Sequence, residues 1–122
     1  MTLRIAIAQL DFKVGDIAGN AQRILDTANE ARNRLGAKAV VFPELTLSGY
    51  PPEDLILRRD FLTTVEKALE GLARDVTGIT AIVGFPETTD EGVYNSAAVL
   101  GDGAIRHVYR KQWLPNLPQE FW

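Results

Sequence analysis

Short apolar runs alternate with amphipathic helical segments along most of this chain, and this alternation restricts the fold more than any other feature. Residues 3–10 and 37–42 are nearly continuous apolar runs, which is typical of strands covered on both faces. Apolar residues recur at steps of three and four over residues 17–35, and the same spacing returns over residues 62–76. A third strand is expected over residues 79–85. The order predicts an α/β layer with parallel strands.

Polar residues and glycines mark the expected ends of the two helices. Asp16 or Asn20 can cap the first helix, and Gly36 can end it. Asp60 is expected to cap the second helix, which Gly78 then breaks. Both helices are therefore bounded by local signals as well as by their apolar stripes.

The remaining segments predict a loop, a turn and a hairpin. Residues 45–59 hold a Pro-Pro pair and are expected to form a structured loop, and residues 86–92 are expected to form a turn. Residues 93–100 and 104–109 have strand character and are joined by Gly-Asp-Gly, which predicts an antiparallel hairpin. Because it is apolar at nearly every position, the first strand is expected at the centre of the sheet.

Composition excludes several classes of protein. A chain of 122 residues with 46% hydrophobic and 24% charged residues fits one soluble globular domain. A net charge of -3 argues against a nucleic-acid-binding surface, and no apolar run is long enough to cross a membrane, so a cytoplasmic location is expected. The absence of cysteine removes disulfides, structural zinc ligands and thiol nucleophiles from this chain.

Two charged residues stand where chemistry gathers in open α/β sheets, beyond the carboxyl ends of strands. Glu44 follows an apolar strand and Pro43, in a setting expected to be dry enough to make it a useful proton acceptor. The alternative is a strand-end carboxylate that only caps the following loop. Lys111 follows Arg110, and the alternative for this pair is a solvated basic face. An inward Lys111 would pair with an inward Glu44, because an isolated buried charge is costly.

Other polar residues give weaker signals. His107 is the only histidine, and without suitable partners at useful spacing it is more often structural than catalytic. Ser48 and Ser96 lack the Gly-x-Ser-x-Gly setting of a hydrolase nucleophile. The glycines form neither a dinucleotide-binding fingerprint nor a phosphate loop.

Five segments in a fixed order resemble the signature of the nitrilase, or carbon–nitrogen hydrolase, superfamily. They are Ile-Ala-Ile-Ala-Gln at 5–9, Val-Gly-Asp at 14–16, Phe-Pro-Glu-Leu at 42–45, Ser-Gly-Tyr at 48–50 and Tyr-Arg-Lys at 109–111. The continuation Gly-Tyr-Pro-Pro-Glu-Asp-Leu at 49–55 resembles the amidase domains of glutamine-dependent NAD synthetases. The resemblance covers residues 3–116, which is nearly the whole chain.

The resemblance implies a Glu, Lys and Cys triad that hydrolyses an amide. In that family the cysteine attacks the carbonyl carbon, the glutamate accepts the cysteine's proton, and the lysine stabilises the oxyanion. Glu44 and Lys111 match the first two positions, and nothing here replaces the cysteine, so this chain alone is expected to be inactive. Tyr50 matches a position that helps line the glutamine pocket; the alternative is a loop aromatic packed on the core.

The resemblance also implies an architecture and partners. The family fold is a four-layer α-β-β-α sandwich, of which residues 1–122 would supply the first half, as a domain incomplete at its C-terminus. The complete enzyme passes ammonia from glutamine to a synthetase domain that uses ATP and magnesium to amidate deamido-NAD; no cofactor is expected in the present segment. Leu117 stands where the family has a tyrosine.

Half a sandwich leaves apolar sheet surface uncovered, so the chain is expected to form a homo-oligomer. Terminal Phe121 and Trp122 are expected to pack against protein. Two other functions stay open: another nitrilase-type amidase acting on a small amide, and a non-catalytic interaction module with the same fold.

Overall fold

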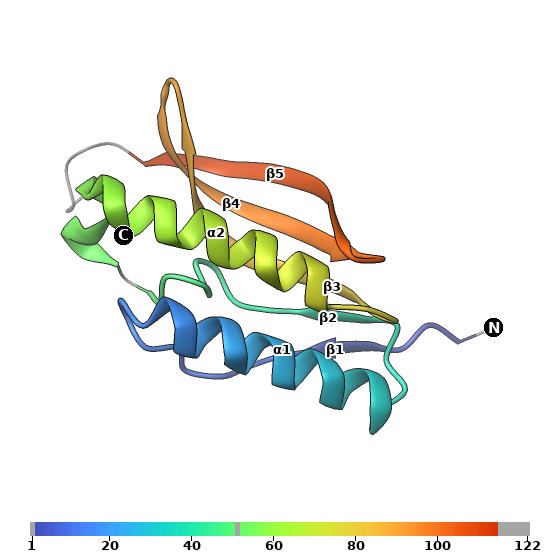
Figure 1. Ribbon diagram of the computed structural model, residues 1–122. Coiled ribbons are helices and arrows are strands. Elements are labelled where there is room, and N and C mark those ends of the chain that lie inside the picture. The colour runs from blue at the N-terminus through green and yellow to red at the C-terminus, as the bar shows by residue number, and fades with distance from the viewer. Residues whose placement is uncertain (1, 51, 115–122) are drawn as a thin grey trace.

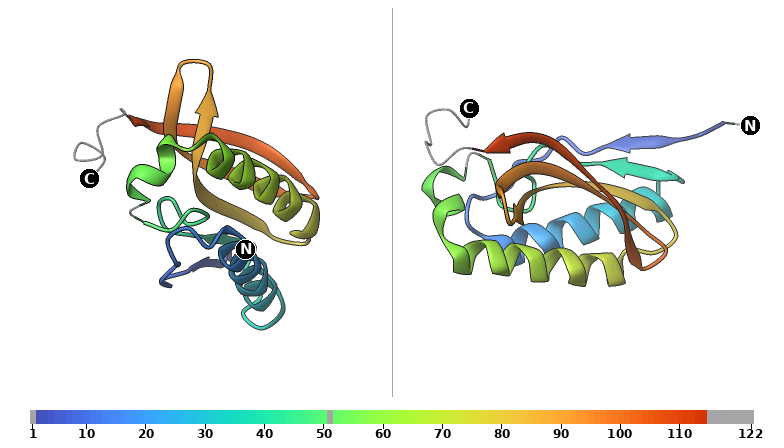
Figure 2. Two further views of the ribbon diagram at one scale, coloured as in Figure 1. Left: turned by 60° about the vertical axis from the view of Figure 1, so that its left-hand side comes forward. Right: turned by 90° about the horizontal axis from the view of Figure 1, so that it is seen from above.

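The protein is a two-layer α/β structure in which one mixed sheet carries two helices. The computed structural model describes residues 2–50 and 52–114, without the side chains of residues 53, 54 and 112–114. Figures 1 and 2 show both helices on the same face of the sheet, while the other face bears no layer from the described residues. The expectations for Leu117, Phe121 and Trp122 lie outside the described residues.

The sheet combines a parallel part and an antiparallel part in chain order. Its strands are β1 (Ile5–Ile7), β2 (Ala39–Val41), β3 (Thr80–Thr89), β4 (Gly92–Gly101) and β5 (Ala104–Leu114). Neighbours in sequence are also neighbours in the sheet, with β1, β2 and β3 parallel and β3, β4 and β5 antiparallel. The predicted α/β layer with an antiparallel extension is therefore confirmed.

The predicted central position of the first strand is wrong, because β1 is an edge strand of the described sheet. It is also shorter than expected. Ala6 packs on the core between the layers, whereas Ile5 and Ile7 are 52% and 73% exposed on the opposite side of the strand. The apolar run at residues 3–10 therefore predicted a strand correctly. Among the described residues, however, no segment packs on the face of β1 that carries Ile5 and Ile7.

The two helices match their predicted apolar stripes. Helix α1 (Ile17–Asn33) begins after Asp16, whose side chain accepts a hydrogen bond from the backbone of Gly19 at 3.1 Å, so one of the two proposed caps is confirmed. Helix α2 (Arg59–Asp75) begins after Arg58, which makes no side-chain cap. The prediction of an Asp60 cap is wrong: Asp60 lies in the first turn and pairs with Arg58 at 3.2 Å.

The loop and turn regions differ in detail from the predictions. The expected loop contains a short helix, η1 (Glu53–Leu57), just before α2. The predicted turn at residues 86–92 is mostly strand, because β3 continues to Thr89 and Pro86 pairs in register with Asn95. The turn between β4 and β5 is as predicted, with Asp102 and Gly103 at φ of 54° and 79°, the left-handed values of a tight hairpin turn.

The hydrophobic core fills the space between the helices and one face of the sheet. Its fully or nearly fully buried members include Ile24, Ala28 and Ala31 from α1, Leu62, Val65, Leu69 and Leu72 from α2, and Val40, Ala81, Val83, Phe85, Ala98 and Leu100 from the strands. Each large side chain buried here stabilises the fold by about 1.5–3 kcal/mol. Among the described helices, none is long and apolar enough to span a membrane.

Candidate functional site

Glu44 is the first residue of a tight turn, which Phe42 and Pro43 separate from the end of β2. The buried hydroxyl of Thr46 donates to the backbone oxygen of Pro43, and the buried hydroxyl of Ser48 donates to that of Leu45 at 3.1 Å. These bonds give the carbonyl groups of Pro43 and Leu45 a hydrogen-bond donor within the turn. Ser48 thus has a structural role, and the turn holds Glu44 at the carboxyl end of the parallel strands.

The turn rests directly on β3 at Gly84. Leu45 is fully buried against Ile56 and has a φ of 52°, a value that non-glycine residues rarely adopt. The amide of Leu47 donates to the carbonyl oxygen of Gly84 at 3.0 Å. A Cβ atom on Gly84 would lie 2.4 Å from the nitrogen of Leu45. The close approach that places Glu44 therefore requires glycine in the strand below it.

A buried asparagine links this turn to the start of α1. Asn20 is 2% exposed, and its side-chain nitrogen donates to the carbonyl oxygens of Lys13 at 2.8 Å and Leu47 at 3.1 Å. Its side-chain oxygen accepts from the amide of Lys13 at 3.0 Å. Rather than capping the helix, Asn20 joins two loops that meet beside the Glu44 turn.

Lys111 reaches Glu44 from β5, at an irregularity of the ladder. Asn95 pairs with Gln112 and Ser96 pairs with Arg110, so Lys111 is an extra residue opposite that step of β4. Such bulges bend a strand and redirect side chains. Lys111 Nζ lies 3.2 Å from Glu44 Oε2, although 67 positions separate the two residues. The predicted proximity of Glu44 and Lys111 is confirmed; their catalytic roles stay predictions.

Asn95 is a third member of the site, and the motifs in the sequence did not predict it. Its side-chain nitrogen donates to Glu44 Oε1 at 2.5 Å, and the residue is only 3% exposed. Because a carboxylate only accepts hydrogen bonds, this contact sets the orientation of the amide. Among the described residues, the buried Oδ1 of Asn95 has no partner. The polar pair of Asn95 and Ser96 inside a largely apolar strand was the signal in the sequence that could have revealed it.

The surroundings of Glu44 are wetter than predicted. The side chains of Glu44 and Lys111 are 47% and 52% exposed, so the expected dry environment is not found among the described residues. An exposed ion pair of this kind stabilises a fold by about 0–1 kcal/mol. A gain in stability therefore does not explain why the side chains of Glu44 and Lys111 converge. A carboxylate beside an ammonium group is chemically suited to accepting a proton and to stabilising a negative charge.

A small cavity opens beside the carboxylate. It has a volume of about 210 Å³ and is lined by Glu44, Tyr50 and residues 10–12, 43, 45 and 46. Tyr50 is 50% exposed, which fits both a pocket residue and the alternative of a loop aromatic packed on the core. Tyr50 and Glu44 thus line the same small cavity, and the role of Tyr50 in a ligand pocket stays a prediction.

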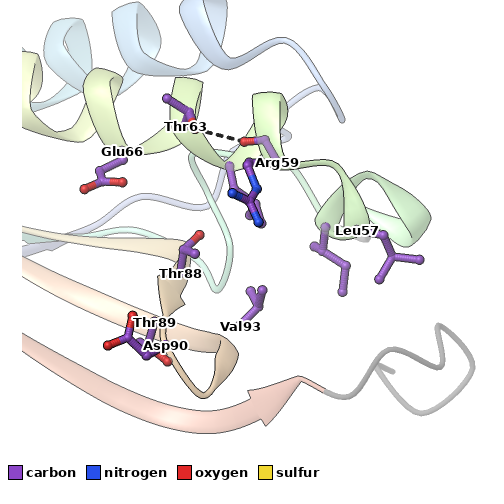
Figure 3. Close-up of a pocket in the computed structure, with 10 residues that line it drawn as sticks. Leu57, Arg59, Thr63, Glu66, Thr88, Thr89, Asp90 and Val93 are labelled. Atoms are coloured by element: carbon purple, nitrogen blue, oxygen red, sulfur yellow. Dashed lines mark hydrogen bonds between the residues drawn. The ribbon is translucent and has the colours of Figure 1, made fainter.

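A larger cavity lies away from this carboxylate. It has a volume of about 870 Å³ and lies between the start of α2, where Arg59, Thr63 and Glu66 line it, and the β3–β4 turn (Figure 3). Glu44, Lys111 and Tyr50 do not line it. Its walls hold no set of side chains suited to covalent catalysis.

Other candidate groups do not join the site. His107 lies beside Tyr109 on β5, with ring centroids 6.0 Å apart, and both side chains are exposed. Within residues 2–50 and 52–114, no group of three or more His, Cys, Asp or Glu side chains is placed to hold a metal ion. The described chemistry therefore centres on one carboxylate, one ammonium group and one buried amide.

Curated relatives share this sequence at high identity. The chain is 53% identical over 114 residues to a glutamine-dependent NAD(+) synthetase of Xylella fastidiosa, and 46% identical over 116 residues to one of Thermotoga maritima. These matches cover 93% of the present chain in both cases, but only 21% and 20% of the relatives. The chain thus spans about a fifth of the length of the curated relatives it matches.

Solved structures share the fold. The glutamine-dependent NAD+ synthetase of Acinetobacter baumannii, determined with ADP, superposes with a TM-score of 0.84 at 38% identity over 93% of this chain and 22% of its own. An amidase from Nesterenkonia superposes with a TM-score of 0.77 at 26% identity, over 98% of this chain and 48% of its own. The sheet and helices are therefore part of the nitrilase fold.

The family model for carbon-nitrogen hydrolases matches residues 4–121, which include the Glu44 turn, β4 and Lys111. This match, the high identity to curated relatives and the shared fold all agree with the resemblance in the sequence. The chain belongs to the carbon–nitrogen hydrolase family.

Proposed function

We propose that this chain supplies two residues of an amide-hydrolysing site, Glu44 as general base and Lys111 as oxyanion stabiliser, in a glutamine-dependent NAD synthetase. The observation that carries the proposal is the 3.2 Å contact between Lys111 Nζ and Glu44 Oε2 at the carboxyl end of the parallel strands. The 53% identity to a synthetase supports the choice of reaction. A cysteine outside this chain acts as the nucleophile.

Each group has a defined part in the proposed reaction. Glu44 takes the proton from the cysteine thiol as sulfur bonds to the amide carbon of glutamine, and the carbonyl oxygen becomes an oxyanion beside Lys111. The proton then passes from Glu44 to the leaving nitrogen. The C–N bond breaks, ammonia departs, and the glutamyl group remains bound to the cysteine as a thioester. Water hydrolyses this thioester to glutamate. Asn95 holds Glu44 Oε1 during these steps, and Tyr50 lines the pocket for glutamine.

In the whole protein, the ammonia released at this site has a second use. Ammonia passes to a synthetase domain that uses ATP and magnesium to amidate deamido-NAD in the cytoplasm. The structure of the Acinetobacter baumannii synthetase with ADP supports a nucleotide site in such a protein. The present residues form the first half of a four-layer sandwich domain, in keeping with the 48% of the Nesterenkonia amidase that they match.

The runner-up function is hydrolysis of a small amide by a free-standing amidase. The Nesterenkonia amidase supports it, and one variant of that protein carries a covalent adduct at its active-site cysteine. Identity favours the synthetase, at 53% against 26% for the amidase. A non-catalytic interaction module fits less well, because it gives no reason for Lys111 and Asn95 to converge on Glu44, whereas amide hydrolysis does.

A chimera tests the proposal. This chain replaces the matched 114-residue segment of the Xylella fastidiosa synthetase, and the unaltered synthetase is the reference. The chimera should form NAD from deamido-NAD with glutamine as nitrogen source, whereas the isolated chain should release no ammonia from glutamine because it has no thiol nucleophile. Ammonia release by the pure isolated chain would contradict the proposal, as would a chimera that uses free ammonia but never glutamine.

We also propose that the isolated chain self-associates through the sheet face that lacks helices. Ile5 and Ile7 lie on that face of β1 and Tyr109 is 60% exposed on β5, so apolar surface is in contact with water at both edges of the sheet. Sedimentation velocity at low micromolar concentration should show a dimer or larger species. Ile7→Lys should shift the chain toward monomer, while Leu57→Lys, at an exposed apolar site outside the sheet, should not. A wild-type monomer would refute this expectation.

A further inference from the structure

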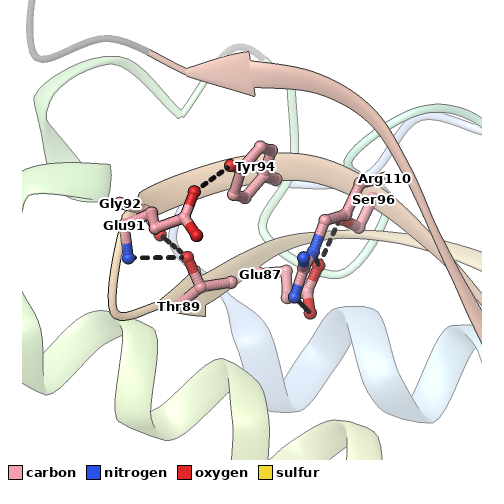
Figure 4. A network of polar contacts seen from close by, with 7 residues as sticks. All are labelled: Glu87, Thr89, Glu91, Gly92, Tyr94, Ser96 and Arg110. Carbon is pink, nitrogen blue, oxygen red and sulfur yellow. Dashed lines mark hydrogen bonds and ion pairs between the residues drawn. The ribbon is translucent and has the colours of Figure 1, made fainter.

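A carboxylate on the opposite side of the sheet from Glu44 joins the three antiparallel strands. Glu87 on β3 accepts from the hydroxyl of Ser96 on β4 at 2.8 Å. Its two oxygens also accept from Nε and Nη2 of Arg110 on β5, at 2.9 and 3.2 Å (Figure 4). Because the planar guanidinium of Arg110 binds Glu87 at two points, it fixes the orientation of the two side chains as well as the distance between them. Glu87 on β3 therefore restrains β4 and β5 at the pair formed by Ser96 and Arg110.

The restraint is supported by its surroundings. The guanidinium of Arg110 lies 5.0 Å from the ring centre of Tyr94, and the side chain of Glu87 is only 19% exposed. Burial raises the pKa of Glu87, but hydrogen bonds from Arg110 and Ser96 and the charge of Arg110 outweigh it and lower the pKa below its usual value. Glu87 is thus charged at neutral pH, with both of its oxygens engaged.

The restrained residues are the direct neighbours of the residues that bind Glu44. Ser96 follows Asn95 on β4, and Arg110 precedes Lys111 on β5. Successive strand residues point to opposite faces, so contacts on the helix side fix the backbone from which Asn95 and Lys111 extend on the other side. The bulge lies at this step, and an irregular ladder leaves the local register weakly determined by backbone pairing alone.

We propose that Glu87 is a positioning residue, which clamps Ser96 and Arg110 at the bulge so that Asn95 and Lys111 converge on Glu44. The proposal deepens the function proposed above and relies on it for its purpose. The clamp touches no reacting atom and acts through the backbone of β4 and β5. Loss of the clamp should therefore change the direction of the Asn95 and Lys111 side chains, which lie on the face of the sheet that lacks helices.

Solution NMR of the labelled 122-residue chain tests the clamp without reference to any reaction. The reporters are the side-chain amide signals of Asn95 and the ε-methylene signals of Lys111. Glu44→Gln defines the signals of a site without its carboxylate. Glu87→Gln should move both reporters toward that reference, and Arg110→Gln, which removes the clamp from the other strand, should move them the same way. Glu70→Gln, at an exposed carboxylate on α2, is the matched control and should leave them unchanged.

Circular dichroism separates a lost clamp from a lost fold, because both clamp variants should keep the far-ultraviolet spectrum of the wild type. If one variant fails to fold, the other still tests the proposal from the opposite strand. Asn95 and Lys111 signals that stay at their wild-type positions in either folded variant would overturn the clamp. A failure of the proposed hydrolysis would appear in the chimera instead, with these NMR shifts unaffected, so the two failures are distinguishable.

Discussion

Glu44→Gln and Lys111→Met should each abolish glutamine-driven NAD formation by the chimera with the Xylella fastidiosa synthetase, while free ammonia still supports the reaction. Glutamine in place of Glu44 cannot accept the thiol proton, a contribution of roughly 10²- to 10⁴-fold in rate. Methionine keeps the bulk of Lys111 but removes the charge beside the developing oxyanion, which costs about 10²- to 10³-fold. Initial rates with glutamine and with ammonium chloride, measured side by side, give the comparison.

Matched controls come from helix α2. Glu70→Gln and Lys67→Met remove the same chemical groups from exposed positions outside the site, and both should keep full activity with either nitrogen source. Loss of the ammonia-driven reaction together with the glutamine-driven one would contradict the assigned roles. It would place the effect of the substitutions in the synthetase reaction or in the fold.

Gly84→Ala should displace the Glu44 turn and destabilise the chain. The added methyl would meet backbone atoms, 2.4 Å from the nitrogen of Leu45 and 2.7 Å from the oxygen of Pro43, so no side-chain rotation can relieve the clash. Overpacking of this kind costs about 1–3 kcal/mol in unfolding free energy. Urea denaturation of the chain measures the cost, and the glutamine-driven rate of the corresponding chimera measures the displacement of Glu44.

Gly71→Ala is the matched control for this substitution. On α2, its added methyl would lie no closer than 3.7 Å to Arg74, and alanine favours a helix over glycine by about 1 kcal/mol. This control should therefore be neutral or stabilising. If Gly84→Ala were as stable as the control and as active with glutamine as the wild type, the close packing of the turn on β3 would not be what places Glu44.

The sequence predicted the local elements well because their signals are local. The apolar stripe of α1, the Asp16 cap and the Gly-Asp-Gly turn all depend on residues close together in the chain. The position of β1 could not be predicted in the same way. A strand at the edge of a sheet and one at the centre present the same apolar run, and only the packing of distant segments decides between them.

The site was predicted in part for a related reason. Strand alternation required that one of Arg110 and Lys111 point inward, but it could not say which face each would reach, because that choice depends on the bulge opposite Asn95. Asn95 itself binds a carboxylate 51 positions away, a contact that no local pattern encodes. The Asp60 cap was wrongly predicted because Arg58, with an extended backbone, takes the position before the first helical residue.

Mass spectrometry of the covalent intermediate tests the central claim most directly. The chimera is mixed with glutamine, quenched in acid within the first turnovers and analysed as the intact protein. We predict a glutamyl thioester in the wild-type chimera, little or none in Glu44→Gln and Lys111→Met at the same time points, and the wild-type amount in Glu70→Gln. A thioester that accumulates at the wild-type rate without Glu44 or Lys111 would contradict the account, because the nucleophile would then need neither residue.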